Sequence, residues 1–231
     1  MKLTQKFSKH QIATAIAILF HAVGLAGILL FKSETIIRAT PFNLLLVFAL
    51  LLWAQDDKNI FFWLFVIAAV LTGIAVEIIG VNTGLLFGDY KYGNVLGPKY
   101  KQVPLIIGIN WFIVVYCCGI SITALLQRII KPIESTAAAP APVLKALSVI
   151  SDGATLALFF DWLIEPVAMK LGYWQWQNNE VPLYNYACWF GVSLLLMVIF
   201  RFSPFEKRNK TAVHLLLIQL MFFLTLRTFL Q

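Results

Sequence analysis

Three acidic residues lie inside or beside strongly apolar segments, where a carboxyl group is costly to bury. The stretch FFDWLIEP (159–166) contains Asp161 and Glu165, and a third acid, Glu77, ends another apolar run. Asp161 and Glu165 are four residues apart, so they share one face of a helix. A carboxylate at mid-membrane costs about 2.5–3.5 kcal/mol. Because such a group usually has a function and points into the protein, these three residues are the candidate catalytic residues.

Carboxyl groups in this setting are suited to acid catalysis. Removal from water favours the protonated form of a carboxyl group, and a second acid nearby favours it further for one member of the pair. We therefore expect one of the three acids to hold a proton near neutral pH and to act as a general acid, although the sequence does not say which one. The alternative is structural, with Asp161 and Glu165 reaching the membrane interface or accepting a backbone hydrogen bond.

Aromatic and amide side chains accompany these acids along the chain. Electron-rich ring faces stabilise cations by about 0.5–2 kcal/mol each, so an acid between aromatic walls is suited to protonating an alkene to a tertiary carbocation. The candidate substrate-binding residues are Tyr90, Tyr92, Asn110, Trp111, Trp162, Trp174, Trp176, Asn185 and Trp189. Two alternatives remain open. Trp174 and Trp176 suit an interfacial aromatic belt, and the two asparagines suit helix caps.

Membrane helices must position these residues. Of the 231 residues, 60% are hydrophobic and 13% are charged, and the mean hydropathy is +0.82, which is far from the composition of a soluble domain. We expect an all-α, polytopic membrane bundle, a single domain over residues 1–231, with no removed signal peptide. Apolar windows of about 20 residues predict seven spans, near 11–31, 36–55, 60–82, 104–126, 143–168, 185–202 and 211–230. The second span is the weakest because its apolar run is short.

The net charge of +7 is explained by membrane topology. Lysine and arginine residues lie mostly at the ends of apolar runs instead of forming one patch, which argues against a nucleic-acid partner. Their distribution predicts a plasma-membrane protein with the amino terminus inside the cell and the carboxy terminus outside, unless the second span is miscounted. A Pro/Ala-rich stretch at 135–145 is expected to be a flexible cytoplasmic linker.

One ordered pattern occurs twice in the chain. Glu77 is followed by FGDYKYGN (87–94), VPL (103–105) and Asn110-Trp111, and Glu165 is followed by LGYWQWQN (171–178), VPL (181–183), Asn185 and Trp189. Each copy begins at the end of an odd-numbered span and finishes at the start of the next one. The copies are therefore parallel repeats of spans three and four and of spans five and six. All the candidate residues then meet on one side of the membrane, which the charge distribution makes the non-cytoplasmic side.

Other kinds of chemistry lack their sequence signals. The histidines, His10, His21 and His214, are scattered and predict no metal cluster. No G-x-G-x-x-G motif predicts a nicotinamide or flavin domain, so no cofactor is expected. Three cysteines, Cys117, Cys118 and Cys188, are interpreted as small packing residues.

The repeated motifs carry a family resemblance. The run from Glu77 through FGDYKYG, VPL and Asn110-Trp111, together with DWLIEP, GYWQW, VPLYN and Trp189, resembles the carotenoid biosynthesis protein family over about residues 70–195. Known members include the γ-carotene and bisanhydrobacterioruberin hydratases. The resemblance implies a cofactor-independent, multi-pass enzyme that adds water across the terminal C=C of an acyclic carotenoid ψ-end and leaves a tertiary alcohol. The resemblance implies an N-x-x-G-W pattern where this chain has NYACW (185–189), so the chain departs from that pattern at Cys188, near the start of the sixth predicted span.

The expected function is that of a carotenoid 1,2-hydratase, whose partners are a lipophilic carotenoid, water and the bilayer. Two other functions remain open. A cofactor-free lycopene cyclase begins with the same protonation, but an internal double bond captures the cation, so the product keeps the mass of the substrate. A small transporter or lipid-binding protein would use the acids to carry protons. Against it, the acids and asparagines gather toward one face instead of the midplane. The particular carotenoid and the oligomeric state are not encoded in a pattern that the sequence displays.

Overall fold

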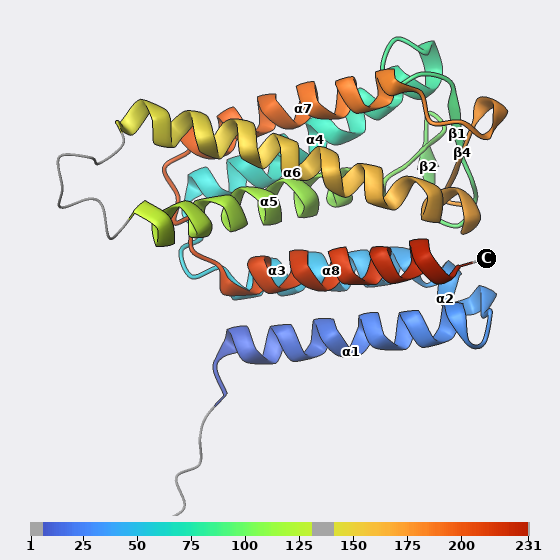
Figure 1. Cartoon of the computed structure of the whole chain (residues 1–231), viewed down its shortest axis with the longest axis horizontal. Helices are drawn as coiled ribbons and strands as arrows, with labels where there is room; N and C mark the ends of the chain where they lie inside the picture. Colours follow the sequence, from blue (N-terminus) through green and yellow to red (C-terminus); the bar gives the residue numbers. More distant parts are fainter. Residues whose placement is uncertain (1–6, 131–140, 231) are drawn as a thin grey trace, which may run out of the picture.

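The computed structural model describes residues 7–130 and 141–230, and it forms a bundle of membrane helices (Figure 1). Among the described residues, six helices are long and apolar enough to cross a membrane, namely α1 (Lys9–Leu29), α4 (Ile60–Thr83), α5 (Ile106–Ile130), α6 (Pro142–Lys170), α7 (Leu183–Phe202) and α8 (Lys210–Phe229). A shorter apolar helix, α3 (Thr40–Ala54), follows the five-residue helix α2 (Glu34–Arg38). The predicted all-α, polytopic membrane fold is confirmed.

Two predicted segments differ in detail. The second span, predicted at 36–55, is divided into α2 and α3 because the chain turns at Ala39 and Pro41 occupies the first turn of α3. The linker predicted at 135–145 lies mostly outside the described residues. Its last part is helical instead of flexible, because α6 begins at Pro142, whose missing N–H and fixed φ suit a first helical turn.

The helices form two groups (Figure 1). Helices α4, α5, α6 and α7, which carry the two repeats, pack together, and α5 and α6 contact α8. Helix α3 packs against α1 and α5, and α1 packs against α8. The first repeat is therefore a helical pair, α4 and α5, set against the second pair, α6 and α7.

Short strands connect the helices of each repeat at one end of the bundle (Figure 1). Strand β1 (Tyr90–Tyr92) lies in the first repeat and β4 (Trp174–Trp176) in the second, and they pair antiparallel with Tyr90 opposite Trp176, Lys91 opposite Gln175 and Tyr92 opposite Trp174. The register is symmetric about the central Lys91–Gln175 pair. Equivalent positions of the two motifs thus exchange places, as a two-fold axis along the membrane normal requires of parallel repeats.

A second hairpin occurs in the first repeat alone. Strands β2 (Lys99–Tyr100) and β3 (Val103–Pro104) pair antiparallel through a tight turn in which Lys101 and Gln102 both have positive φ. In the second repeat, a short 3₁₀ turn, η1 (Gln177–Asn179), leads directly to Pro182 and α7. The hairpin accounts for the longer connection between Glu77 and its VPL motif.

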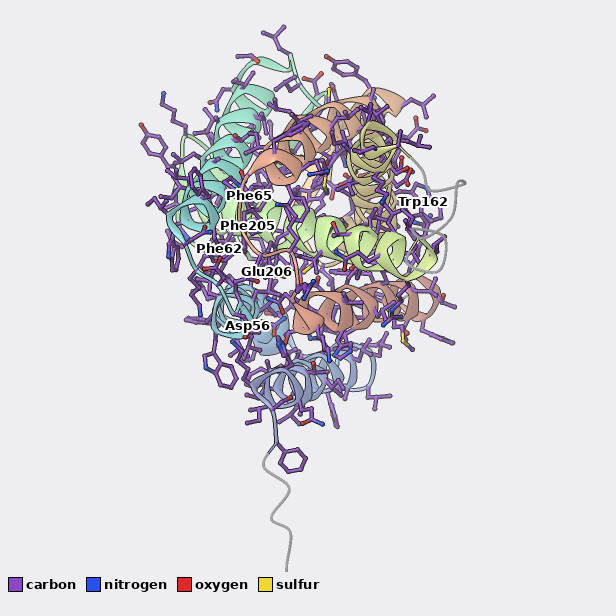
Figure 2. The ribbon with its side chains drawn as sticks, turned by 90° about the vertical axis from the view of Figure 1, so that its left-hand side faces the viewer. Asp56, Phe62, Phe65, Trp162, Phe205 and Glu206 are labelled. Carbon is purple, nitrogen blue, oxygen red and sulfur yellow. The ribbon has the colours of Figure 1, made fainter. Side chains whose placement is uncertain are left out.

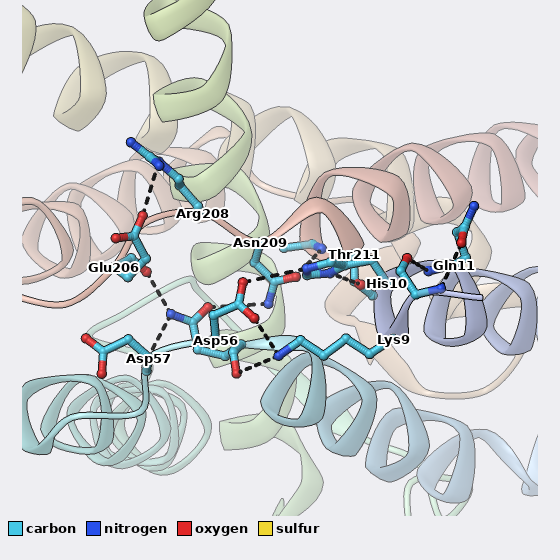
Figure 3. A network of polar contacts seen from close by, with 12 residues as sticks. Lys9, His10, Gln11, Asp56, Asp57, Glu206, Arg208, Asn209 and Thr211 are labelled. Carbon is cyan, nitrogen blue, oxygen red and sulfur yellow. Dashed lines mark hydrogen bonds and ion pairs between the residues drawn. The ribbon is translucent and has the colours of Figure 1, made fainter. Parts of the chain in front are cut away.

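Polar contacts fasten the opposite end of the bundle (Figure 3). The Lys9 ammonium lies 2.7 Å from an Asp56 carboxylate oxygen, His10 hydrogen-bonds to Thr211, and Arg208 pairs with Glu206. The first two contacts join the start of α1 to the α3–α4 loop and to the start of α8, and the third lies within the α7–α8 loop. Aromatic rings pack just inside this end, where Phe205 lies against Phe62 and Phe65 (Figure 2).

Candidate active site

A small cavity beneath the β1–β4 ladder brings the three acids together. Its volume is about 30 Å³, and it is lined by Glu77, Phe87, Tyr90, Tyr92, Ile107, Asn110, Trp111, Asp161, Glu165, Trp174, Trp176, Asn185 and Trp189. A cavity of this size with polar walls has room for a water molecule. Of the residues predicted from sequence, all three acids and eight of the nine proposed binding residues line this one space.

Glu77 is held by three donors from its own repeat. The hydroxyl groups of Tyr90 and Tyr92 donate to its Oε2 at 2.5 and 2.7 Å, and the Trp111 indole N–H donates to its Oε1 at 3.0 Å. Burial, and then the neighbouring Glu77 carboxyl, raises the pKa of both tyrosines above the ordinary value of 10.0. The two hydroxyl groups therefore remain available as donors over the working pH range.

Glu165 is held in the same manner by the second repeat, with different donors. The indole N–H groups of Trp174 and Trp176 donate to its Oε2 at 2.9 and 2.7 Å, and the Asn185 amide donates to its Oε1 at 3.3 Å. Strands β1 and β4 therefore act as matched clamps, because alternate side chains of a strand point to the same face. Each clamp directs its two aromatic donors at the glutamate of its own helix.

Asp161 differs from both glutamates. The Asn185 amide donates to its Oδ2 at 3.0 Å, and no donor from the described part of the chain contacts its Oδ1. It is as deeply buried as the glutamates, at 3% exposure. Asn185 thus joins the two acids of α6, and Asp161 keeps one carboxyl oxygen free at the cavity wall.

The first repeat has no partner for Asp161. Four residues before Glu77, at the position that corresponds to Asp161 before Glu165, the chain has Gly73. A Cβ atom at Gly73 would come within 2.6 Å of the Trp111 side chain, so the glycine allows that indole to reach Glu77. At this position the second repeat has the side chain of Asp161, whereas in the first repeat the Trp111 ring occupies the space beside Gly73.

Aromatic rings from both repeats enclose the acids. Trp111 and Trp189 stack with ring centroids 3.8 Å apart and an interplanar angle of 11°. Tyr90 and Trp176, which face each other across the ladder, have centroids 4.9 Å apart. No lysine or arginine of residues 7–130 and 141–230 pairs with any of the three acids. The ring faces, together with the carboxyl groups, are therefore placed to stabilise a cation in this cavity.

Comparison with known proteins agrees with this architecture. The carotenoid biosynthesis protein family matches residues 39–231. The chain belongs to this family. A bisanhydrobacterioruberin hydratase from Haloarcula japonica is 27% identical over 141 residues, which cover 59% of this chain and 44% of that protein. The chain therefore spans less than half the length of that relative, and no solved structure matches.

One predicted site residue lies elsewhere in this member of the carotenoid biosynthesis family. Trp162 is on the outer face of α6, 42% exposed, with the Arg227 guanidinium 3.8 Å from its ring centroid. Figure 2 shows it at the periphery of the bundle. Because residues one position apart on a helix point in different directions, Trp162 faces outward when Asp161 faces the cavity.

The two asparagines are not equivalent. Neither caps a helix, since Pro182 is the N-cap of α7 and Asn110 lies within the first turns of α5. The Asn185 amide bonds two acids, whereas the Asn110 side chain lines the cavity with no hydrogen bond to the described residues. Their shared position after a VPL motif did not predict this difference.

Sequence reasoning missed Phe87 and Ile107 as lining residues. Phe87 has a positive φ of 66°, a strained conformation for a bulky residue, and its backbone N–H donates to the Cys188 sulfur at 3.3 Å. Cys188 therefore does more than fill space, because its sulfur accepts this hydrogen bond. The only signal for Phe87 was its place next to Gly88 in the repeated motif.

Among the described residues, no group of three or more His, Cys, Asp or Glu side chains is arranged to hold a metal ion. The residues that line the site supply carboxyl groups, N–H and O–H donors, and aromatic faces.

Proposed function

We propose that this protein is a carotenoid hydratase that adds water across the terminal C=C of an acyclic ψ-end. Family membership supports a role in carotenoid biosynthesis, and the relative from Haloarcula japonica is named for a hydration reaction. The observation that carries the proposal is the free Oδ1 of Asp161 at a cavity with room for water. We also propose, from the charge bias, that this cavity lies on the non-cytoplasmic side.

Asp161 is the proposed general acid because of how the hydrogen bonds are distributed. Each glutamate already accepts three hydrogen bonds, which stabilise its ionised form, whereas Asp161 accepts one. A proton on Oδ1 of Asp161 displaces nothing and points into the cavity. Buried polar groups that are left unpaired are costly, which favours placing the mobile proton on Asp161.

The proposed reaction conserves atoms and charge. Asp161 gives its proton to the CH carbon of the terminal double bond, and the adjacent carbon becomes a tertiary cation. A water molecule then attacks that carbon through its oxygen and passes a proton to the Asp161 carboxylate, which restores the acid. Trp111, Trp189 and Trp176 line the space in which the cation forms, and Glu165, linked through Asn185, orients the water.

The test is expression in bacteria that accumulate lycopene, followed by mass analysis of the pigments after growth with and without ¹⁸O-labelled water. A product heavier by one labelled water supports hydration. An isomer of unchanged mass would replace the proposal with cyclisation, which uses the same acid. Unaltered lycopene and γ-carotene in parallel hosts would contradict both reactions. The water-sized cavity beside Asp161 favours hydration over cyclisation.

A further inference from the structure

A second, apolar cavity lies next to the acid site on the side of the lipid-facing helices. It has a volume of about 250 Å³ and lies between α1, α3, α5, α6 and α8. Part of its rim is formed by exposed side chains of α1 and α3, including Phe20, Val23 and Phe42. On a membrane helix such residues face lipid. The cavity, which we call the lipid-side groove, therefore opens toward the bilayer.

Asn110 connects the groove to the acid site, because it lines both cavities. The acid cavity alone, at about 30 Å³, takes water but not a hydrocarbon end group, so a wall residue has to move when such a group enters. Asn110, the residue that lines both cavities, has no side-chain hydrogen bond to the described residues. Moving the Asn110 side chain therefore breaks no hydrogen bond to the described residues.

A third cavity shows which side suits water. It lies over the strands and is lined by Asp89, Lys91, Gln175 and Gln177 together with Tyr90 and Trp176, which also line the acid site. Its polar walls and its place at the helix ends fit access from the aqueous phase. A long apolar molecule is therefore expected from the opposite side, through the groove.

The groove has the composition of a ligand-binding site. Its lining is mostly apolar, with two deeply buried polar side chains, His21 and Gln219, each 5% exposed. Nδ1 of His21 bonds to the Ala17 carbonyl oxygen, while its Nε2 and the Gln219 amide have no partner within residues 7–130 and 141–230. Buried polar atoms usually have a partner, and apolar pockets with a few polar groups are typical of small-molecule sites.

We infer that the lipid-side groove binds the polyene chain of the substrate and that Asn110 is the gate through which its terminal alkene reaches Asp161. This inference rests on the proposed function for the identity of the molecule. Part of the groove wall, from α1 and α2, precedes residue 39, where the family match begins.

Two variants test the groove at different lining residues. Gly24→Leu on α1 and Ala39→Leu before α3 both place a branched side chain into it. Gly191→Leu is the matched control, because a Cβ atom there meets nothing within 4 Å on the exposed side of α7.

Each protein is purified in detergent from lycopene-accumulating cells, and the amount of lycopene retained per amount of protein is measured. Hydration is then measured with lycopene and with an acyclic monoterpene that has the same end group but no polyene chain.

Both groove variants should retain and hydrate lycopene about tenfold less than the wild type and Gly191→Leu, as expected for overpacking of a binding cavity. Hydration of the monoterpene should not change. Lycopene retained by all four proteins alike, or by none, would overturn the inference. Equal loss with both substrates would also overturn it, because the effect would then lie at the acid site. If the variants lose lycopene but no protein forms a water adduct, the groove stands and the proposed hydration fails.

Discussion

The clamps around Glu77 and Glu165 are built to one plan, and two of their differences bear on the chemistry. Both glutamates accept two hydrogen bonds from aromatic side chains of their own strand. Around Glu77 the strand donors are hydroxyl groups, and around Glu165 they are indole N–H groups. In addition, the second repeat has Asp161 where the first has Gly73. In the proposed mechanism, this difference divides the work: one repeat holds the cavity together, and the other carries the mobile proton.

The largest effect is expected at the acid that has no counterpart. Asp161→Asn removes the proton donor while keeping the size of the side chain, and hydration should fall by about 10²–10⁴-fold, the usual contribution of a general acid. The measurement is turnover per folded protein in membranes. Asp152→Asn, at an exposed position on the same helix, is the matched control and should behave as wild type. Full activity in Asp161→Asn would remove the distinction between the repeats.

The next effect concerns the asparagine that joins the two acids of the second repeat. Asn185→Ala leaves Asp161 without its hydrogen bond and should reduce turnover by about 10²-fold, since small misplacements of catalytic groups have effects of that size. Asn110→Ala breaks no such bond and should change the turnover much less. Equal losses in the two variants would show that the asparagines are equivalent after all.

The two glutamates should differ in stability when each is changed to glutamine. In Glu77→Gln, the hydroxyl groups of Tyr90 and Tyr92 can turn and accept from the new amide. In Glu165→Gln, the amide meets indole N–H groups, which donate only, and a buried donor is left unpaired at a cost of about 1–3 kcal/mol. Thermal unfolding in detergent should therefore show a lower midpoint for Glu165→Gln than for Glu77→Gln. Equal midpoints would mean that the donor type does not matter.

The smallest effect is expected outside both clamps. Trp162→Phe keeps an aromatic ring on the outer face of α6 and should change hydration less than twofold, whereas Trp189→Phe alters the stacked pair inside the cavity and should reduce it more. Both are measured in the same pigment assay. A larger loss from Trp162→Phe would extend the site to the lipid-facing surface.

Much of this arrangement could be predicted from the sequence because the repeat carried the information. Membrane helices reveal themselves by length and composition, and the paired order of acid, aromatic strand and VPL motif placed eleven of the proposed site residues around one space. The prediction for Trp162 was wrong because it relied on nearness to Asp161 in the sequence and ignored the direction in which each side chain leaves the helix. Phe87 was missed because its inward position depends on a strained backbone that no residue preference indicates.

By itself, the sequence determined the membrane bundle, the duplication and the gathering of acids and aromatics at one end, because these follow from local composition and from the direction in which each helix runs. Only the tertiary structure decided which acid has a free oxygen, which asparagine joins two carboxyl groups, and that a lipid-side groove meets the cavity at Asn110. The physical reason is that hydrogen-bond partners and cavities arise between helices that are distant in sequence. Their atoms are brought within 3 Å of one another by packing, which local patterns do not specify.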